Sequence, residues 1–146
     1  MELDALYTDL IMEHSRSGHN RHSVEDASVK ERGHNPSCGD DITLELKLEN
    51  GKIAEAGFSG HGCAISQASA SIMIDLVTDK TLSEAHNLAE TFLSMIKREE
   101  LSEDELETLE DAAAFQNISN MPARVKCAVL GWHTLERAIE KVEAND

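Results

Sequence analysis

The segment ITLELKLENGKIAEAGF, residues Ile42–Phe58, decides the fold. Apolar and polar residues alternate over Ile42–Glu49 and continue to alternate over Ile53–Phe58, which is the period of a strand with one buried face. Between the two runs lies Asn50-Gly51, the pair that most strongly favours a two-residue hairpin turn. The segment therefore predicts an antiparallel hairpin with its turn at Asn50 and Gly51.

Helical patterns lie on both sides of this hairpin in the chain. Apolar residues at helical spacing predict helices over Glu2–Ser15, Ala64–Val77, Leu82–Lys97, Glu103–Phe115 and from Pro122 to about Ala144. In the last of these the apolar stripe consists of Val125, Val129, Trp132, Leu135, Ile139 and Val142. Ser28–Arg32 has the pattern of a short edge strand. Strands that come early and helices that come late predict an α+β fold: a small antiparallel sheet, made of the hairpin 42–58 and an edge strand, with helices covering one face.

Length, charge and cysteine content limit the classes of function. At 146 residues the chain is expected to form a single domain over residues 1–146. Its formal net charge of −15 repels nucleic acid and anionic lipid, so neither a nucleic-acid nor a membrane partner is expected. Eight of the acids lie in Glu99–Asp111, a pattern typical of a solvated helix face. We find no signal-peptide pattern and no apolar run of membrane-spanning length, and we expect a cytoplasmic protein whose three thiols stay reduced.

Each of the three cysteines lies in a distinctive setting. Cys38 belongs to NPSCGDD (35–41), Cys63 to GHGCAIS (60–66) and Cys127 to PARVKCAVLGW (122–132). Asp40 follows Cys38 by two positions, so in an extended chain both side chains point to one face. Because the outer ends of a hairpin meet, Cys38 before the first strand and Cys63 after the second are expected to lie close together.

Two of the thiols also lie where helices are expected to begin. A helix N-terminus stabilises a thiolate, and this favours reactive or metal-bound thiols at Cys63 and Cys127. The plain alternative is that each cysteine is a small buried apolar residue, and it applies best to Cys127, which Ala-Val-Leu follows.

Three thiolates and one carboxylate form a four-ligand set that zinc accepts. The set consists of Cys38, Asp40, Cys63 and Cys127. Its charge exceeds that of Zn²⁺, and Arg124, three residues before Cys127 on the same helix face, is a candidate to compensate it. His34 and His61 are competing ligands beside the first two thiols.

The motifs NPSCGD, GHGCAIS and PARVKCAVLGW, in this order, resemble those of the U-type iron–sulfur cluster assembly proteins, over nearly the whole chain. Within that family the sequence resembles the SufU type more than the IscU type. Lys126 stands where the IscU type usually has histidine, the proline-rich chaperone-recognition motif is missing, and the segment between Cys63 and Cys127 is long. His61 also departs from the family, since an acidic residue can occur there in relatives.

The resemblance implies a zinc site made by Cys38, Asp40, Cys63 and Cys127. It further implies that Cys38 accepts persulfide sulfur from a SufS-type, pyridoxal-phosphate-dependent cysteine desulfurase, that Arg124 assists, and that the sulfur passes to downstream iron–sulfur scaffold proteins. Two alternatives stay open: a scaffold on which an iron–sulfur cluster is assembled at the same ligands, and a structural zinc module without sulfur chemistry.

Overall fold

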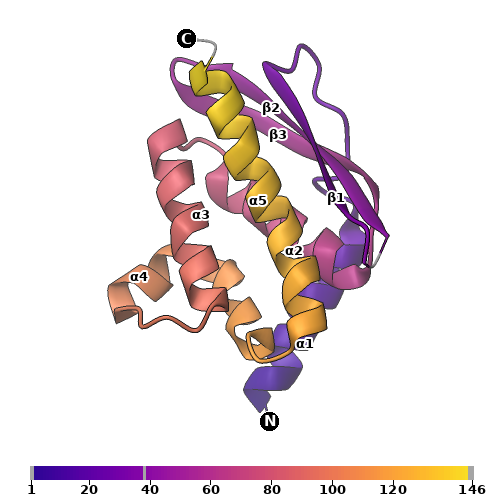
Figure 1. The fold of residues 1–146 in the computed structure, drawn as a ribbon, viewed down its shortest axis with the longest axis vertical. Helices are drawn as coiled ribbons and strands as arrows, with labels where there is room; N and C mark the ends of the chain where they lie inside the picture. The colour runs from indigo at the N-terminus through magenta and orange to yellow at the C-terminus, as the bar shows by residue number, and fades with distance from the viewer. Residues whose placement is uncertain (1, 38, 145–146) are drawn as a thin grey trace.

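The computed structural model describes residues 2–37 and 39–144, with side chains from residue 9 onward. The elements follow one another along the chain in Figure 1. They are α1 (Glu2–Ser17), β1 (Val29–Asn35), β2 (Asp40–Glu49), β3 (Lys52–His61), α2 (Ala64–Val77), α3 (Leu82–Ile96), α4 (Glu103–Thr108), the 3₁₀ helix η1 (Glu110–Ile118) and α5 (Pro122–Ala144). The α+β expectation is confirmed.

The sheet has three strands in the order β1-β2-β3, and both pairs are antiparallel. Glu49 pairs with Lys52, and the two residues between them have positive φ, 54° at Asn50 and 77° at Gly51. The predicted turn is therefore confirmed, with the conformation that Asn-Gly favours. β1 is an edge strand, as predicted, but it runs to Asn35 and forms a second hairpin with β2.

The second hairpin strand departs from the alternation expected of it. Lys47 pairs with Glu55 but Leu48 pairs with Ile53, so Ala54 is an extra residue in β3. Beyond such a bulge, side chains that would point to one face of the sheet point to the other. As a result Ile53 lies in the core together with Ala56 and Phe58, although uninterrupted alternation would separate them.

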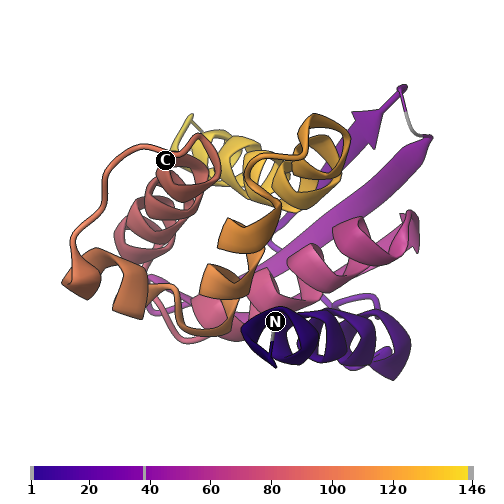
Figure 2. The ribbon, with the colours of Figure 1, turned by 90° about the horizontal axis from the view of Figure 1, so that it is seen from below.

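Helices cover one face of the sheet, as predicted. Ile42, Leu44 and Leu46 of β2 are buried, and α2 and α5 pack against the strands. Figure 2 shows α2 and α5 next to the sheet, with α1 beyond α2 and with α3 and η1 farther out. Trp132 of α5 stacks on Phe92 of α3, with ring centroids 4.2 Å apart. This aromatic contact joins the inner and outer helices in the core.

The helix predicted over Glu103–Phe115 is wrong in its second half. A capping box between Ser102 and Glu105 starts α4, which ends at Thr108. Glu110 then takes a positive φ of 48° and the chain continues as η1. Four of the five buried apolar residues in this segment recur every third position, at Leu109, Ala112, Phe115 and Ile118, and the fifth is Ala114. A 3₁₀ helix, with three residues per turn, puts such residues on one face, which explains the change.

Within the described residues, no helix combines the length and the apolar character that crossing a bilayer requires.

Candidate metal centre

Three elements bring potential metal ligands together at one end of the sheet. Asp40 is the first residue of β2, Cys63 immediately precedes α2, and Cys127 lies in the second turn of α5. One ligand atom from each lies within 4.8 Å of the others. In Figure 1 this is where the β1–β2 connection, the start of α2 and the first turns of α5 converge. The structure thus groups three of the four residues that the sequence singled out.

Asp40 is a buried member of the group and ties β2 to α2. Only 2% of its surface is exposed. Its Oδ1 accepts a hydrogen bond of 2.9 Å from the backbone N–H of Cys63, and its Oδ2 lies 3.7 Å from the Cys63 Sγ. These contacts between protein atoms therefore orient the carboxylate toward the thiol.

Cys63 is the N-cap residue of α2. Its backbone is extended, with φ −70° and ψ 170°, and its Sγ accepts a hydrogen bond of 3.4 Å from the N–H of Ser66. A sulfur in this position faces the backbone N–H groups of the first turn of α2. The prediction that Cys63 opens a helix is confirmed.

Two neighbours of Cys63 contribute to the site and were not identified from the sequence. Ser66 is buried and places its Oγ 3.7 Å from the Cys63 Sγ. At Gly62 an added Cβ would overlap the Ser66 Oγ and lie 3.2 Å from Asp40 Oδ1, so only glycine leaves room here. The Cys-x-x-Ser spacing of an N-cap and its third residue was the available signal for Ser66.

Cys127 approaches the cluster from α5 and is 8% exposed. Its Sγ lies 3.6 Å from the carbonyl oxygen of Ala123, one turn earlier in the helix. It packs as a buried apolar residue would, yet it also belongs to the ligand group. Its burial agrees with the plain alternative, and its role as a metal ligand stays a prediction that its place in this group supports.

Cys38 lies outside the described residues, so its predicted place beside Cys63 stays a prediction. The chain around it is described. Asn35 pairs with Asp40 across the β1–β2 hairpin, and the Asn35 carbonyl accepts a 2.9 Å hydrogen bond from the N–H of Gly39. Gly39 has φ 78°, a positive value that glycine adopts without a steric penalty. Asp41 pairs with His61, which confirms that the outer ends of the β2–β3 hairpin meet.

The charged residues near the cluster are exposed. Arg124 and Lys126 lie on the first turns of α5, and neither side chain forms an ion pair with the described residues. His34 and His61 flank Asp41 across the sheet, and neither belongs to the ligand group found among the described residues. Arg32 donates hydrogen bonds to Asp41, and this, with its charge and those of the two histidines, lowers the pKa of that carboxyl.

The donor set suits zinc. Thiolate and carboxylate are its usual anionic ligands, and Zn–S and Zn–O bonds of about 2.3 and 2.0 Å in a tetrahedron place a sulfur and an oxygen ~3.5 Å apart. The separation of 3.7 Å between Cys63 Sγ and Asp40 Oδ2 is close to such a tetrahedral edge. The three described residues can therefore hold such an ion, with room in the set for a fourth ligand.

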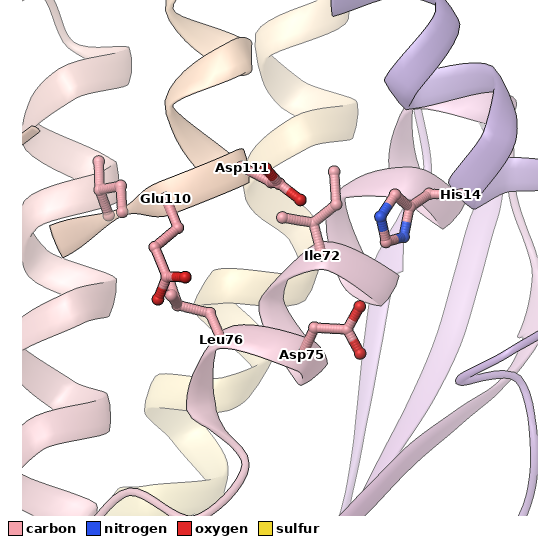
Figure 3. Close-up of a pocket in the computed structure, with 7 residues that line it drawn as sticks. His14, Ile72, Asp75, Leu76, Glu110 and Asp111 are labelled. Carbon is pink, nitrogen blue, oxygen red and sulfur yellow. The ribbon is translucent and has the colours of Figure 1, made fainter. Parts of the chain in front are cut away.

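A small cavity elsewhere does not compete with this site. It has a volume of about 60 Å³ and lies among α1, α2 and the start of η1. Figure 3 shows His14 and Asp75 on one side of it and Glu110 and Asp111 on the other. A cavity of this size is far below the roughly 300 Å³ at which pockets for small organic ligands begin.

Comparison with known proteins shows the family to which this chain belongs. The family described as NifU-like N terminal domain matches residues 6–146. The chain belongs to the NifU-like N-terminal domain family. Its cysteine motifs, its three-stranded sheet and its Asp40–Cys63–Cys127 group are therefore features of a NifU-like protein, and the resemblance drawn from those motifs is confirmed.

Relatives of this NifU-like chain carry two different names. It is 39% identical over 142 residues to a protein of Thermotoga maritima named iron-sulfur cluster assembly scaffold protein IscU, covering 97% of this chain and 98% of the relative. It is 38% identical over 144 residues to the Bacillus subtilis protein named zinc-dependent sulfurtransferase SufU, covering 99% and 96%. The crystal structure of a putative iron-sulfur cluster assembly scaffold protein for the SUF system from Fervidobacterium islandicum superimposes with a TM-score of 0.85 at 38% identity, covering 92% and 97%.

Proposed function

We propose that this chain is a zinc-dependent sulfurtransferase of iron–sulfur cluster assembly, with residues 1–146 as one SufU-like domain. In this proposal Cys38 accepts persulfide sulfur from a SufS-type cysteine desulfurase and passes it to downstream iron–sulfur scaffold proteins, in the cytoplasm. The observation that carries it is the convergence of Asp40, Cys63 and Cys127 from three separate elements.

Zinc would be held by these three residues and by Cys38. When bound, it would keep the coordinating thiols deprotonated and tie the sheet to both helices. Three thiolates and one carboxylate exceed the charge of Zn²⁺ by two negative charges. The exposed cations Arg124 and Lys126, on the same turns of α5 as Cys127, are the nearest in sequence that can balance this excess.

Three of the four ligand residues are held by described elements of the fold. Asp40 is fixed by the Cys63 N–H, Cys63 caps α2, and Cys127 lies within α5. Cys38 belongs to the connection between β1 and β2, whose neighbours Pro36, Ser37 and Gly39 are exposed. We therefore assign the reactive role to Cys38.

Sulfur acceptance then follows the chemistry of thiol exchange. The Cys38 thiolate attacks the outer sulfur of the persulfide on the desulfurase cysteine. A new S–S bond forms at Cys38 while the old one breaks, and the desulfurase cysteine leaves as a thiolate. The Arg124 guanidinium, which lacks an ion-pair partner among the described residues, is available to stabilise the anions of this exchange.

The second candidate is a scaffold that assembles an iron–sulfur cluster at the same residues. The relative named as a scaffold is as similar to this chain as the relative named as a sulfurtransferase. Thiolates are also the usual ligands of iron–sulfur clusters. Lys126 in place of the histidine usual in the IscU type is what favours the sulfurtransferase, because an ammonium group offers no ligand while protonated.

Anaerobic purification followed by metal and sulfide analysis separates the candidates. The sulfurtransferase retains about one zinc per chain after incubation with desulfurase, cysteine and ferrous iron, and develops no cluster absorbance. A scaffold exchanges zinc for iron and acid-labile sulfide. A structural zinc module keeps zinc and does not stimulate the desulfurase. The Cys38→Ser variant is the control, since it removes the acceptor without touching a described element.

A further inference from the structure

A second group of metal-ligating side chains lies between α3 and α5, away from the thiols. His86 and Glu90 are one turn apart on α3, and Glu136 faces them from α5. One ligand atom from each lies within 4.8 Å of the others. In Figure 1 the two helices run side by side in opposite directions. Glu136 follows Cys127 by nine residues, or about 13 Å of helix, so the two groups are separate.

One pair in this group already has the spacing of two ligands on one cation. The His86 Nε2 lies 3.6 Å from the Glu90 Oε1. Nitrogen and oxygen ligands at about 2.0–2.2 Å in a tetrahedron are ~3.4 Å apart. Glu136 lies within 4.8 Å of both and would move closer to them around a bound ion.

A neighbouring histidine supports the carboxylate from α5. The His133 Nδ1 lies 3.5 Å from the Glu136 Oε1, one turn earlier on the same helix. Partners of this kind orient metal-binding carboxylates and are common around metal sites. Glu136 is also the least exposed of the four, with 18% of its side chain accessible. Its orientation is thus limited by packing as well as by His133.

The electrostatics of the group favour a dication. Glu90 and Glu136 bring two carboxylates together within 4.8 Å, and their like charges repel each other. A divalent ion between the two carboxylates would remove this repulsion.

We propose that His86, Glu90 and Glu136 form a second metal site, selective for a divalent ion of the zinc class and joining α3 to α5. Imidazole nitrogen together with carboxylate oxygen suits zinc better than magnesium or calcium, which prefer oxygen alone. Three protein ligands leave one position for water.

The test is a comparison of zinc binding by variants with identical thiol sites. Wild type, His86→Ala, Glu90→Gln and Glu103→Gln are first given one equivalent of zinc and are then titrated further by calorimetry. Glu103 is an exposed acid on α4 outside the group, so its variant controls for the loss of one surface charge. Wild type and Glu103→Gln should bind one additional ion, and the other two variants should bind it about tenfold or more weaker.

Crystals soaked in zinc provide the independent measurement. Anomalous scattering at the zinc edge should give a peak between His86, Glu90 and Glu136 in the wild type and none there in Glu90→Gln. Added zinc should also raise the melting temperature of the wild type more than that of Glu90→Gln. The proposal would be overturned if all four proteins bound additional zinc with equal affinity and stoichiometry. It would also be overturned if no anomalous peak appeared between α3 and α5. Because the comparison is made between variants, it does not depend on which metal the thiols bind.

Discussion

The carboxylate of Asp40 accepts a hydrogen bond of 2.9 Å from the backbone N–H of Cys63, which joins the start of β2 to the start of α2. The two residues are 23 positions apart in the chain, and the β2–β3 hairpin brings them together. One oxygen of the carboxylate thus holds the helix terminus, while the other faces the thiol at 3.7 Å. Asp40 therefore has a structural role and a role as a metal ligand that substitutions can separate.

Substitution of Asp40 should reveal these two roles. Asp40→Asn retains a carbonyl oxygen for the Cys63 N–H, whereas Asp40→Ala removes it and costs about 1–3 kcal/mol of unfolding free energy. Both variants lose the anionic ligand. In metal-free protein, denaturant unfolding should give a higher unfolding free energy for Asp40→Asn than for Asp40→Ala. Both variants should bind zinc weakly and stimulate a desulfurase poorly. Wild-type stimulation by Asp40→Ala would show that the carboxylate has no part in sulfur acceptance.

Replacing Cys63 by serine should remove metal without removing the helix cap. Serine is itself a preferred N-cap residue, so α2 should still begin at Ala64. Zinc content should fall, and the melting temperature of the zinc-loaded protein should fall with it. Cys127→Ser should behave alike. After chelation the melting temperatures of wild type and Cys63→Ser should converge, and full zinc retention by both variants would contradict the ligand assignment.

We predict that replacing Gly33 by a larger residue destabilises the protein for a steric reason. A Cβ at this position of β1 would overlap the Thr134 Oγ1 and lie 3.3 Å from Leu130 Cδ1, both on α5. Gly33→Ala should therefore destabilise the protein by about 1–3 kcal/mol in denaturant unfolding. Adding Thr134→Ala should restore part of this loss, since it removes the overlapping hydroxyl. Additive effects of the two substitutions would mean that the contact is not the cause.

The start of α3 should make stability depend on pH. The Glu84 carboxylate accepts a hydrogen bond of 3.0 Å from the N–H of Thr81, and this bond, with the Thr81 hydroxyl and nearby lysines, lowers the pKa of Glu84 below its ordinary value of 4.5. A lowered pKa in the folded state stabilises the protein above pH 4.5, and the contribution is lost as the pH falls through the folded value.

Thermal unfolding of wild type and Glu84→Gln across this pH range tests the dependence. The wild type should be more stable at neutral pH, and the difference should shrink in acid. In a Thr81→Ala background the difference should be only partly reduced, because the backbone N–H of residue 81, the main partner of the Glu84 carboxylate, is still present. A difference that grew on acidification would have the wrong sign for this explanation.

Local patterns predicted much of the fold. Asn50-Gly51 placed the first hairpin, and the periodicity of Ala64–Val77 gave α2 with its bounds. The bulge at Ala54 could not be predicted, because it depends on which face of β3 the helices cover. The break at Glu110 carried no glycine or proline, and it follows from packing of residues at a spacing of three.

The sequence predicted the parts of the site that follow from the order and pairing of the strands. Because a hairpin joins its outer ends, the turn predicted that Cys38 approaches Cys63, and the structure places Asp40, two residues after Cys38, beside Cys63. The hydrogen bond between them, the glycine required at position 62 and the role of Ser66 depend on atomic packing that no sequence pattern specifies. The group of His86, Glu90 and Glu136 was missed because it joins two helices distant in sequence.

The most direct test of the account is the site at which sulfur first appears. The protein is incubated anaerobically with a cysteine desulfurase and cysteine, quenched at short times with an alkylating agent and digested for mass spectrometry. We expect one additional sulfur on the peptide carrying Cys38 before any appears on those carrying Cys63 or Cys127. Cys38→Ser should remain folded and fail to stimulate the desulfurase. First appearance of sulfur on Cys127, or on Cys63, would contradict the assignment of Cys38 as the acceptor.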